Sequence, residues 1–243
     1  MNDLFKIAYQ PYKWIIVIPA MALNTLVMAL ICIVVGAVFG PDKADAMAVI
    51  WARIFCAIAL IRVRIEGRQN YDPRASYVVV ANHKSMADIP ALHGYTGLII
   101  KWVMKMELKK IPIFGTACSF LGCIYVNRSN GQAAVESIKA AKKKLSDKAS
   151  VLFFAEGTRS RGELLPFKKG AFVFAMTSGL PVLPVTIKNS EHILPSDTLD
   201  LMPGTVELII HPPVHIQNCS KADLNKKIDQ VHRTIAGALE RYC

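Results

Sequence analysis

The sequence predicts an α/β protein, with a single core domain whose mostly buried sheet is flanked by helices, preceded by an N-terminal two-helix membrane segment. Three observations lead to this prediction. The first 65 residues hold two apolar stretches, short β-branched runs alternate with helical periods after them, and no repeat or low-complexity linker divides the remainder. We therefore expect membrane-anchoring helices over residues 1–65 and an α/β domain over residues 66–243.

The composition favours a protein that works at a lipid surface. The 243 residues include 29 Lys and Arg against 18 Asp and Glu, although 53% of all residues are apolar. This combination suits an anionic lipid surface or a phosphorylated substrate. Nucleic acid is the rival partner for a basic chain. It is not expected, because the sequence has no zinc-finger spacing, no RNA-recognition signature and no uninterrupted basic helix with interleaved aromatic residues.

The cysteines and histidines give no sign of a metal site. The six cysteines form no CxxC pair, and we interpret them as reduced thiols of a protein that faces a reducing compartment. His211, His215 and Cys219 are evenly spaced, but Pro212 and Pro213 exclude the continuous helix that would align them. We interpret these three as strand or turn residues and expect no metal ion.

The first predicted element is an apolar helix. The 27 residues of Trp14–Gly40 contain no charged side chain. As a helix this stretch would be about 40 Å long, more than the ~30 Å of a hydrocarbon core, so it can span a bilayer or lie tilted within it. Pro19 and Asn24 predict a bend near its start.

The second predicted element is a shorter apolar helix, Ala46–Ile61, which is interrupted only by Arg53 and followed by Arg62, Arg64 and Arg68. Its 16 residues are marginal for crossing a membrane. A hairpin with both ends on the cytoplasmic side and a shallow pair of helices in one leaflet both remain open. A cleaved signal peptide competes, but its apolar region would run to only roughly 7 to 15 residues.

Five β-branched runs beyond Arg68 predict strands that are buried on both faces of a sheet. They are Ser76–Ala81, Leu98–Val103, Cys123–Val126, Val151–Ala155 and Val182–Ile187. A helix over Gln132–Leu145 is predicted by apolar residues on one face with lysines opposite. Ser220 can cap a last helix whose apolar stripe runs from Leu224 to Leu239.

The first of these strands ends in residues that suggest acid–base chemistry. It runs into Asn82–Asp88, which places His83 in a turn and Asp88 inside the following helix. In that geometry the carboxylate can fix the imidazole tautomer, so that the other ring nitrogen takes a proton from a hydroxyl. A structural histidine that caps a helix is the alternative interpretation.

The strand Val151–Ala155 opens into a polar turn that suits an anion. Gly157 allows a sharp turn, Thr158 supplies a hydroxyl, and Arg159 supplies a planar fork that matches phosphate. Glu156 would repel an anion, so we expect it to orient Arg159 or to bond a substrate hydroxyl. A surface turn with incidental charge is the alternative.

Two more basic residues follow predicted strands. Arg128 comes after Cys123–Val126, and Lys105 comes after Leu98–Val103. Two arginines at two strand ends could hold one phosphate. Lys105 could reach the same pocket.

Together these blocks resemble the glycerolipid acyltransferase family, in particular its 1-acyl-glycerol-3-phosphate acyltransferases. The resemblance covers Ser76–Ile187. Its four ordered blocks are Asn82–Asp88, Gly122–Arg128, Glu156–Ser160 and Leu183–Ile187. Phe167–Gly170 is similar to the stretch that follows the third block. Ala155 departs from the family pattern, which commonly has proline before the glutamate, and this weakens the rigidity of the turn.

The resemblance implies an O-acyltransferase of phospholipid biosynthesis. It would move a fatty acyl group from acyl-CoA or acyl-carrier protein to the sn-2 hydroxyl of 1-acyl-glycerol-3-phosphate, which gives phosphatidic acid. His83 would be the base, Asp88 its partner, and Lys105 would stabilise the oxyanion. The glycerol phosphate would be held by Arg128, Glu156, Gly157, Thr158 and Arg159. The resemblance implies no cofactor, and we expect the catalytic domain on the cytoplasmic face of a bacterial inner membrane.

The sequence leaves other functions open. The acceptor could be a lyso-ornithine lipid or another lysophospholipid, since arginines suit any anionic head group. A serine hydrolase is disfavoured because the sequence has no GxSxG nucleophile elbow. A non-catalytic lipid-binding protein is disfavoured because it has no need of the pair formed by His83 and Asp88.

Overall fold

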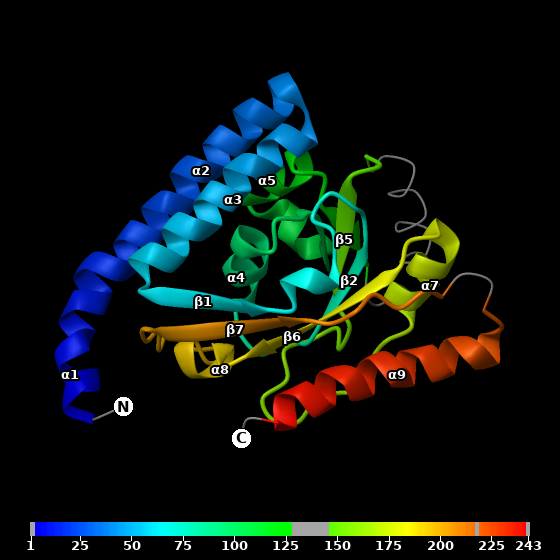
Figure 1. Ribbon diagram of the computed structural model, residues 1–243. Coiled ribbons are helices and arrows are strands. Elements are labelled where there is room, and N and C mark those ends of the chain that lie inside the picture. Colours follow the sequence, from blue (N-terminus) through cyan, green and yellow to red (C-terminus); the bar gives the residue numbers. More distant parts are fainter. Residues whose placement is uncertain (1–2, 128–145, 217–218, 242–243) are drawn as a thin grey trace.

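The computed structural model describes residues 3–127, 146–216 and 219–241. Within these ranges seven strands form one sheet in the order β1-β7-β6-β2-β5-β3-β4 (Figure 1). They are β1 (Ile61–Glu66), β2 (Val78–Ala81), β3 (Ile99–Lys105), β4 (Ile124–Val126), β5 (Ala149–Phe154), β6 (Val182–Lys188) and β7 (Gly204–Ile210). The five neighbouring strands β6, β2, β5, β3 and β4 are parallel, whereas β7 is antiparallel to β6 and parallel to β1. The predicted α/β class with a buried sheet is confirmed.

The five predicted strands all occur, with ends that differ by no more than two residues. β1 and β7 are not predicted from the sequence. In β1 the buried Ile61 is followed by the exposed Arg62 and Arg64, so this edge strand alternates apolar and charged residues. The rule that finds continuous apolar runs therefore passes over it.

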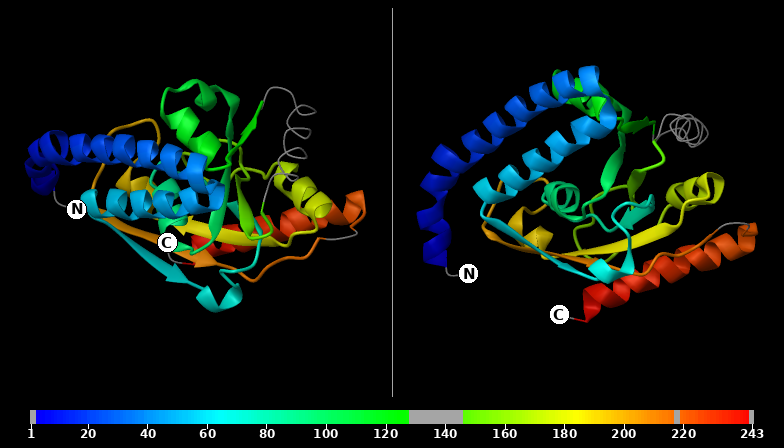
Figure 2. Two further views of the ribbon diagram at one scale, coloured as in Figure 1. Left: turned by 90° about the horizontal axis from the view of Figure 1, so that it is seen from above. Right: turned by 45° about the horizontal axis from the view of Figure 1, so that its top comes forward.

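Helices cover both faces of the sheet (Figure 2). α7 (Gly170–Ser178) and α9 (Lys221–Glu240) pack on one face, and α3 (Pro41–Ile58) and α4 (Asp88–Tyr95) pack on the other. The shorter helical elements are η2 (Arg68–Asn70), η3 (Met106–Lys110), α5 (Phe114–Phe120) and α8 (Ser190–Ile193).

The predicted C-terminal helix is confirmed as α9. Its cap is Ser220, whose hydroxyl accepts a hydrogen bond from the backbone N–H of Asp223 at 3.1 Å. Leu224 and Ile235, two residues of the predicted stripe, are buried against the sheet. The other predicted helix, Gln132–Leu145, lies outside the described residues.

The N-terminal segment differs from the predicted pair of membrane helices. α1 (Asp3–Tyr12), the π-helical turn η1 (Lys13–Val17) and α2 (Ile18–Phe39) follow one another as a single long helix, which is irregular at η1. In the described part of the chain, Lys6–Phe39 is the one helix long and apolar enough to cross a membrane. The second helix, α3, begins at Pro41 rather than at the predicted Ala46.

This earlier start explains the difference. It adds Asp42, Lys43 and Asp45 to α3, which already contains Arg53, so the helix carries too much charge to qualify as a second span. α3 turns back after Gly40 and lies beside α2 (Figure 1).

The exposed surface of α2 indicates membrane association. Its polar side chains face α3: the Asn24 amide donates to the Trp51 carbonyl at 3.2 Å, and the Trp51 indole donates to the Thr25 hydroxyl at 3.1 Å. Many of its apolar side chains point outward instead, with Leu23 62% and Val34 61% exposed. A helix that turns polar groups inward and apolar groups outward suits lipid rather than water.

Candidate active site

The carboxyl ends of the parallel strands bring the predicted site together. β5 lies between β2 and β3, so the segments that follow Ala81, Phe154 and Lys105 emerge at the same edge of the sheet. The first two of these segments begin with the histidine and glutamate blocks.

His83 and Asp88 form a hydrogen-bonded pair. Nδ1 of His83 lies 2.7 Å from Oδ2 of Asp88, which is the first residue of α4 and has no exposed surface. The same oxygen accepts the backbone N–H groups of Lys84 and Ser85, each at 2.9 Å. Three donors and the helix N-terminus therefore hold the buried carboxylate in place.

This geometry leaves one imidazole nitrogen for a substrate. Because Nδ1 of His83 is directed at Asp88, Nε2 is the nitrogen that can take a proton. No hydrogen bond engages Nε2 within the described residues, and 13% of the His83 side chain is exposed. The arrangement inferred from the sequence, with histidine in the turn and aspartate in the helix, is the one observed.

The imidazole rests on an aromatic ring that sequence reasoning missed. The rings of His83 and Phe154 are stacked with centroids 3.7 Å apart and planes 7° apart. Phe154 is the last residue of β5, and Trp102 of β3 lies beside it at 5.9 Å. The signal in the sequence was the position of Phe154 directly at a strand end, but only the order of the strands shows which ring it faces.

Glu156 has a different role from the one expected. Its side chain is buried, and its two oxygens accept the backbone N–H groups of His83 at 2.8 Å and Leu165 at 3.0 Å. The expectation that it orients Arg159 is wrong in this structure. A buried carboxylate with backbone donors braces two loops, and a further bond from the Ser160 N–H to the His83 carbonyl at 2.9 Å joins the same loops.

Arg159 pairs instead with an aspartate from the far side of the site. Its guanidinium lies 3.3 Å from Asp197, which also accepts from Arg161 at 2.7 Å. The hydrogen bond from Arg161 and the charge of Arg159 hold the pKa of Asp197 below its usual value. Asp197 lies in the segment between α8 and β7, and nothing in the sequence links it to the glutamate block.

The remaining predicted site residues differ in their surroundings. Gly157 has a φ of +75°, and a side chain there would meet the ammonium group of Lys168. Thr158 is exposed. Lys105 ends β3 with an exposed side chain, whereas Arg128 lies outside the described residues.

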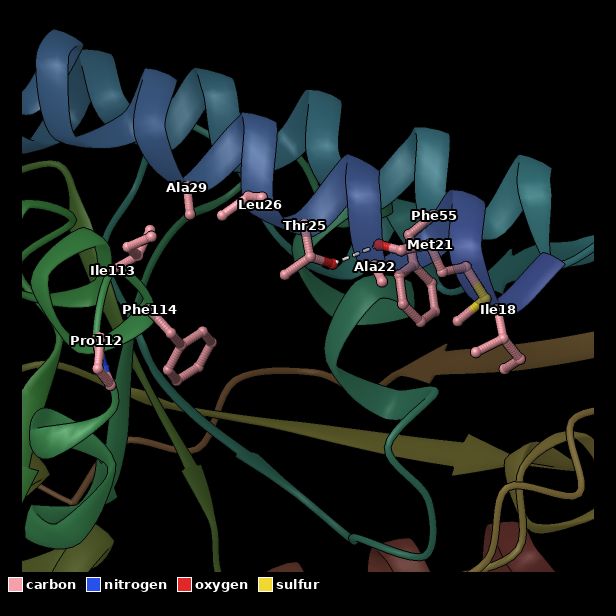
Figure 3. A pocket seen from close by; sticks show the side chains of 10 residues that line it. All are labelled: Ile18, Met21, Ala22, Thr25, Leu26, Ala29, Phe55, Pro112, Ile113 and Phe114. Carbon is pink, nitrogen blue, oxygen red and sulfur yellow. Dashed lines mark hydrogen bonds between the residues drawn. The ribbon is translucent and has the colours of Figure 1, made fainter. Parts of the chain in front are cut away.

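An apolar groove of about 470 Å³ lies between the N-terminal helices and the start of α5 (Figure 3). It is lined by Ile18, Met21, Ala22, Thr25, Leu26, Ala29, Phe55, Pro112, Ile113 and Phe114. The hydroxyl of Thr25 donates to the Met21 carbonyl at 2.8 Å, so its hydrogen is not offered to the groove. The lining suits a hydrocarbon chain.

His211 has a protein partner, and three of the cysteines are buried. His211 Nε2 lies 2.8 Å from the Thr186 hydroxyl. Over the described ranges, no group of three His, Cys, Asp or Glu residues could hold a metal ion. Cys32, Cys56 and Cys118 are buried free thiols.

Comparison with known proteins gives consistent matches. The sequence profile described as Acyltransferase matches residues 62–188. A chloroplastic 1-acyl-sn-glycerol-3-phosphate acyltransferase of Arabidopsis thaliana is 37% identical over 183 residues, 73% of this chain and 49% of the relative. A 1-acyl-sn-glycerol-3-phosphate acyltransferase of Helicobacter pylori is 34% identical over 157 residues, 64% of this chain and 66% of the relative. The chain thus spans about half the length of the plant chloroplast relatives that it matches.

A solved structure matches over almost its whole length. The crystal structure of the 1-acyl-sn-glycerophosphate acyltransferase of Thermotoga maritima superposes with a TM-score of 0.69 at 26% identity. The match covers 92% of this chain and 99% of that one.

Proposed function

Since this chain belongs to the acyltransferase family, we propose that it is a 1-acylglycerol-3-phosphate O-acyltransferase, which makes phosphatidic acid from lysophosphatidic acid and an acyl thioester. The observation that carries the proposal is the 2.7 Å bond between His83 and the buried carboxylate of Asp88. It leaves a histidine nitrogen with no hydrogen-bond partner among the described residues, at the sheet edge where α/β proteins bind their ligands.

The reaction is a direct transfer. Nε2 of His83 takes the proton of the sn-2 hydroxyl as that oxygen attacks the thioester carbonyl. Asp88 stabilises the imidazolium that forms, and Lys105 stabilises the oxyanion. The tetrahedral intermediate then expels the thiolate of CoA or acyl-carrier protein, which takes the proton back from His83. The C–S bond breaks, the ester C–O bond forms, and the base returns to its neutral form.

The turn after β5 supplies the phosphate site in this proposal. Arg159 has a planar fork and is 30% exposed, so it can exchange Asp197 for a phosphate. Gly157 and Thr158 border the same site, and Arg128 is proposed as the second arginine. Glu156 acts indirectly, because both of its oxygens already hold the loops.

In this proposal the N-terminal helices contact the membrane, and the acyl chain enters the protein beside them. We assign the apolar groove to an acyl chain and the exposed face of Lys6–Phe39 to the bilayer, with β1 and the residues that follow it as the catalytic domain on the cytoplasmic side of a bacterial inner membrane. Ala22→Phe would fill part of the groove and shift the preferred acyl chain to shorter lengths. An unchanged chain-length profile would remove the groove from the proposal.

The deciding experiment measures thiol release from long-chain acyl-CoA by the purified full chain in detergent, with and without lysophosphatidic acid. Wild type is compared with His83→Ala and with His192→Ala, a matched control at an exposed histidine on α8. We expect release that needs the acceptor, continues in His192→Ala and disappears in His83→Ala.

Other outcomes point to other functions. Equal release without an acceptor indicates a hydrolase. Release only with a different lysolipid, tested in a panel that includes lyso-ornithine lipid and lysophosphatidylcholine, renames the acceptor. No release with acyl-CoA or with acyl-carrier protein as donor contradicts the proposed transfer and favours a lipid-binding protein.

A further inference from the structure

α4 carries a buried histidine, His93, that the proposed reaction does not use. His93 follows Asp88 by five residues, which places the two about 140° apart around the helix. Nε1 of Trp102 donates to Nδ1 of His93 at 3.0 Å, so the ring proton of His93 sits on Nε2. Burial lowers the pKa of His93 to about 4, which keeps the ring neutral and able to accept this bond at pH 7.

The donor of this bond leads back to the active site. The Trp102 ring lies 5.9 Å from the Phe154 ring, which is stacked on His83 at 3.7 Å. The hydrogen bond between Trp102 and His93 therefore connects the two structures that hold the His83–Asp88 pair. On one side is the helix that begins with Asp88, and on the other is the aromatic stack beneath His83.

The far side of α4 is held by the N-terminal hairpin. Arg53 of α3 donates to the carbonyl of Gly94 at 2.9 Å. Asp45 of α3 lies 3.8 Å from Nε2 of His93 and 3.8 Å from the ammonium group of the buried Lys101. The hairpin thus contacts α4 beside the histidine as well as at the end of the helix.

We propose that His93 and Trp102 are positioning residues for the acyl transfer, an inference that rests on the proposed function. Their bond fixes the rotation of α4 and the seat of Phe154 together, and so sets the distance and angle at which His83 meets Asp88. Neither residue touches the phosphate turn. Loss of the bond therefore lowers kcat and leaves substrate binding unchanged.

The test compares variants that remove the bond with variants that keep it. Trp102→Phe retains a ring but loses the donor, and His93→Leu loses the acceptor. His93→Asn keeps an acceptor oxygen near the position of Nδ1. Trp51→Phe is the matched control, because it deletes an indole donor of the same kind, bonded to Thr25 at 3.1 Å within the hairpin.

We expect kcat to fall about tenfold in Trp102→Phe and in His93→Leu, with KM for both substrates within about twofold of wild type. His93→Asn should restore most of the loss, and the double variant should be no slower than either single variant. The proposal is overturned if Trp51→Phe loses as much kcat as Trp102→Phe, if KM rises instead of kcat falling, or if the two losses multiply.

A second measurement needs no turnover. Stacking on Phe154 shifts the ring-proton resonances of His83 upfield, and these resonances are identified by their absence in His83→Ala. In Trp102→Phe they should move toward the unstacked position, and in Trp51→Phe they should stay. If wild type transfers no acyl group but the resonances respond in this way, the proposed function fails while the contact stands. If wild type is active and neither kcat nor the resonances respond, the positioning proposal alone fails.

Discussion

Asp45 is a buried charge whose cost to folding can be measured. The residue is 3% exposed, and one of its carboxylate oxygens has no hydrogen-bond partner among the described residues. Burial raises its pKa from 3.8 to about 7, although Lys101 at 3.8 Å opposes the shift. The unfolded chain therefore releases this proton near pH 3.8 and the folded chain only near pH 7, so stability falls as the pH rises between these values.

The size of the effect follows from the two pKa values. A difference of about 3 pKa units at about 1.36 kcal/mol each gives about 4 kcal/mol. Asparagine cannot ionise, so Asp45→Asn escapes this loss. Relative to wild type, the free energy of unfolding of the variant should rise by up to about 4 kcal/mol between pH 3.8 and pH 7, then stay level.

The assay is denaturant unfolding of both full chains in the same detergent at a series of pH values, followed by tryptophan fluorescence. The lowered pKa of His93 produces the opposite trend, a loss of stability as the pH falls from 6.5 toward about 4. This trend is present in both proteins and cancels in their difference to first order. A flat difference would mean that burial does not raise the pKa of Asp45, and a difference that falls with pH would mean that Lys101 keeps the buried carboxylate ionised at a net gain. Either result would refute the reasoning.

Three further predictions concern the site itself. Asp88→Asn should lower kcat about 10²- to 10⁴-fold with little change in KM, because the amide cannot stabilise the imidazolium of His83. Steady-state kinetics with purified protein check this, and an unchanged kcat would exclude the pair as the base. Glu156→Gln should cost about 1–3 kcal/mol of unfolding free energy, since one of its backbone donors, from His83 or Leu165, then faces an amide N–H; a melting curve identical to wild type would show that the brace is unimportant. Arg159→Lys should raise KM for lysophosphatidic acid about tenfold at nearly constant kcat, because a lysine cannot bind phosphate with two parallel bonds. KM for the acyl donor should not rise, and an equal effect on both substrates would contradict a phosphate role.

The parts of the fold that the sequence predicts are those whose local pattern matches their burial. β6 is buried at every position and is a continuous apolar run apart from its polar Thr186 and terminal Lys188, and α9 shows a stripe of helical period that starts at a capping serine. β1 fails this test because it is an edge strand with arginines on its exposed positions. α3 includes charged residues near its start, and two of them contact the buried Lys101 of β3: Asp42 at 3.4 Å and Asp45 at 3.8 Å. A pattern of hydropathy alone cannot reveal this.

In the candidate site, too, the sequence predicts contacts between residues that are close in the chain and not those between distant elements. His83 and Asp88 are five residues apart, so their pairing follows from local geometry. The ring beneath His83, the partner of Arg159 and the bond between Trp102 and His93 each join residues from different elements. Their contacts depend on the order β2-β5-β3 and on the seat of α4. Two aromatic residues in neighbouring strands suggest a contact but not which histidine each one meets.

Asp45 lies where α3 contacts α4 and β3, close to His93 and Lys101. A buried carboxylate at this contact lowers the stability of the fold, so its presence calls for a reason other than stability. Replacement of a buried ionisable group by a neutral one of similar size is often neutral or stabilising, and the pKa of Asp45 predicts stabilisation at neutral pH. If this contact serves only to attach the hairpin of α2 and α3 to the domain, Asp45→Asn should be more stable and fully active. If Asp45 helps to hold His93, as its 3.8 Å separation from Nε2 suggests, the same variant should be more stable and have a lower kcat. Measurement of both quantities on one protein therefore separates a cost retained for positioning from a cost without function.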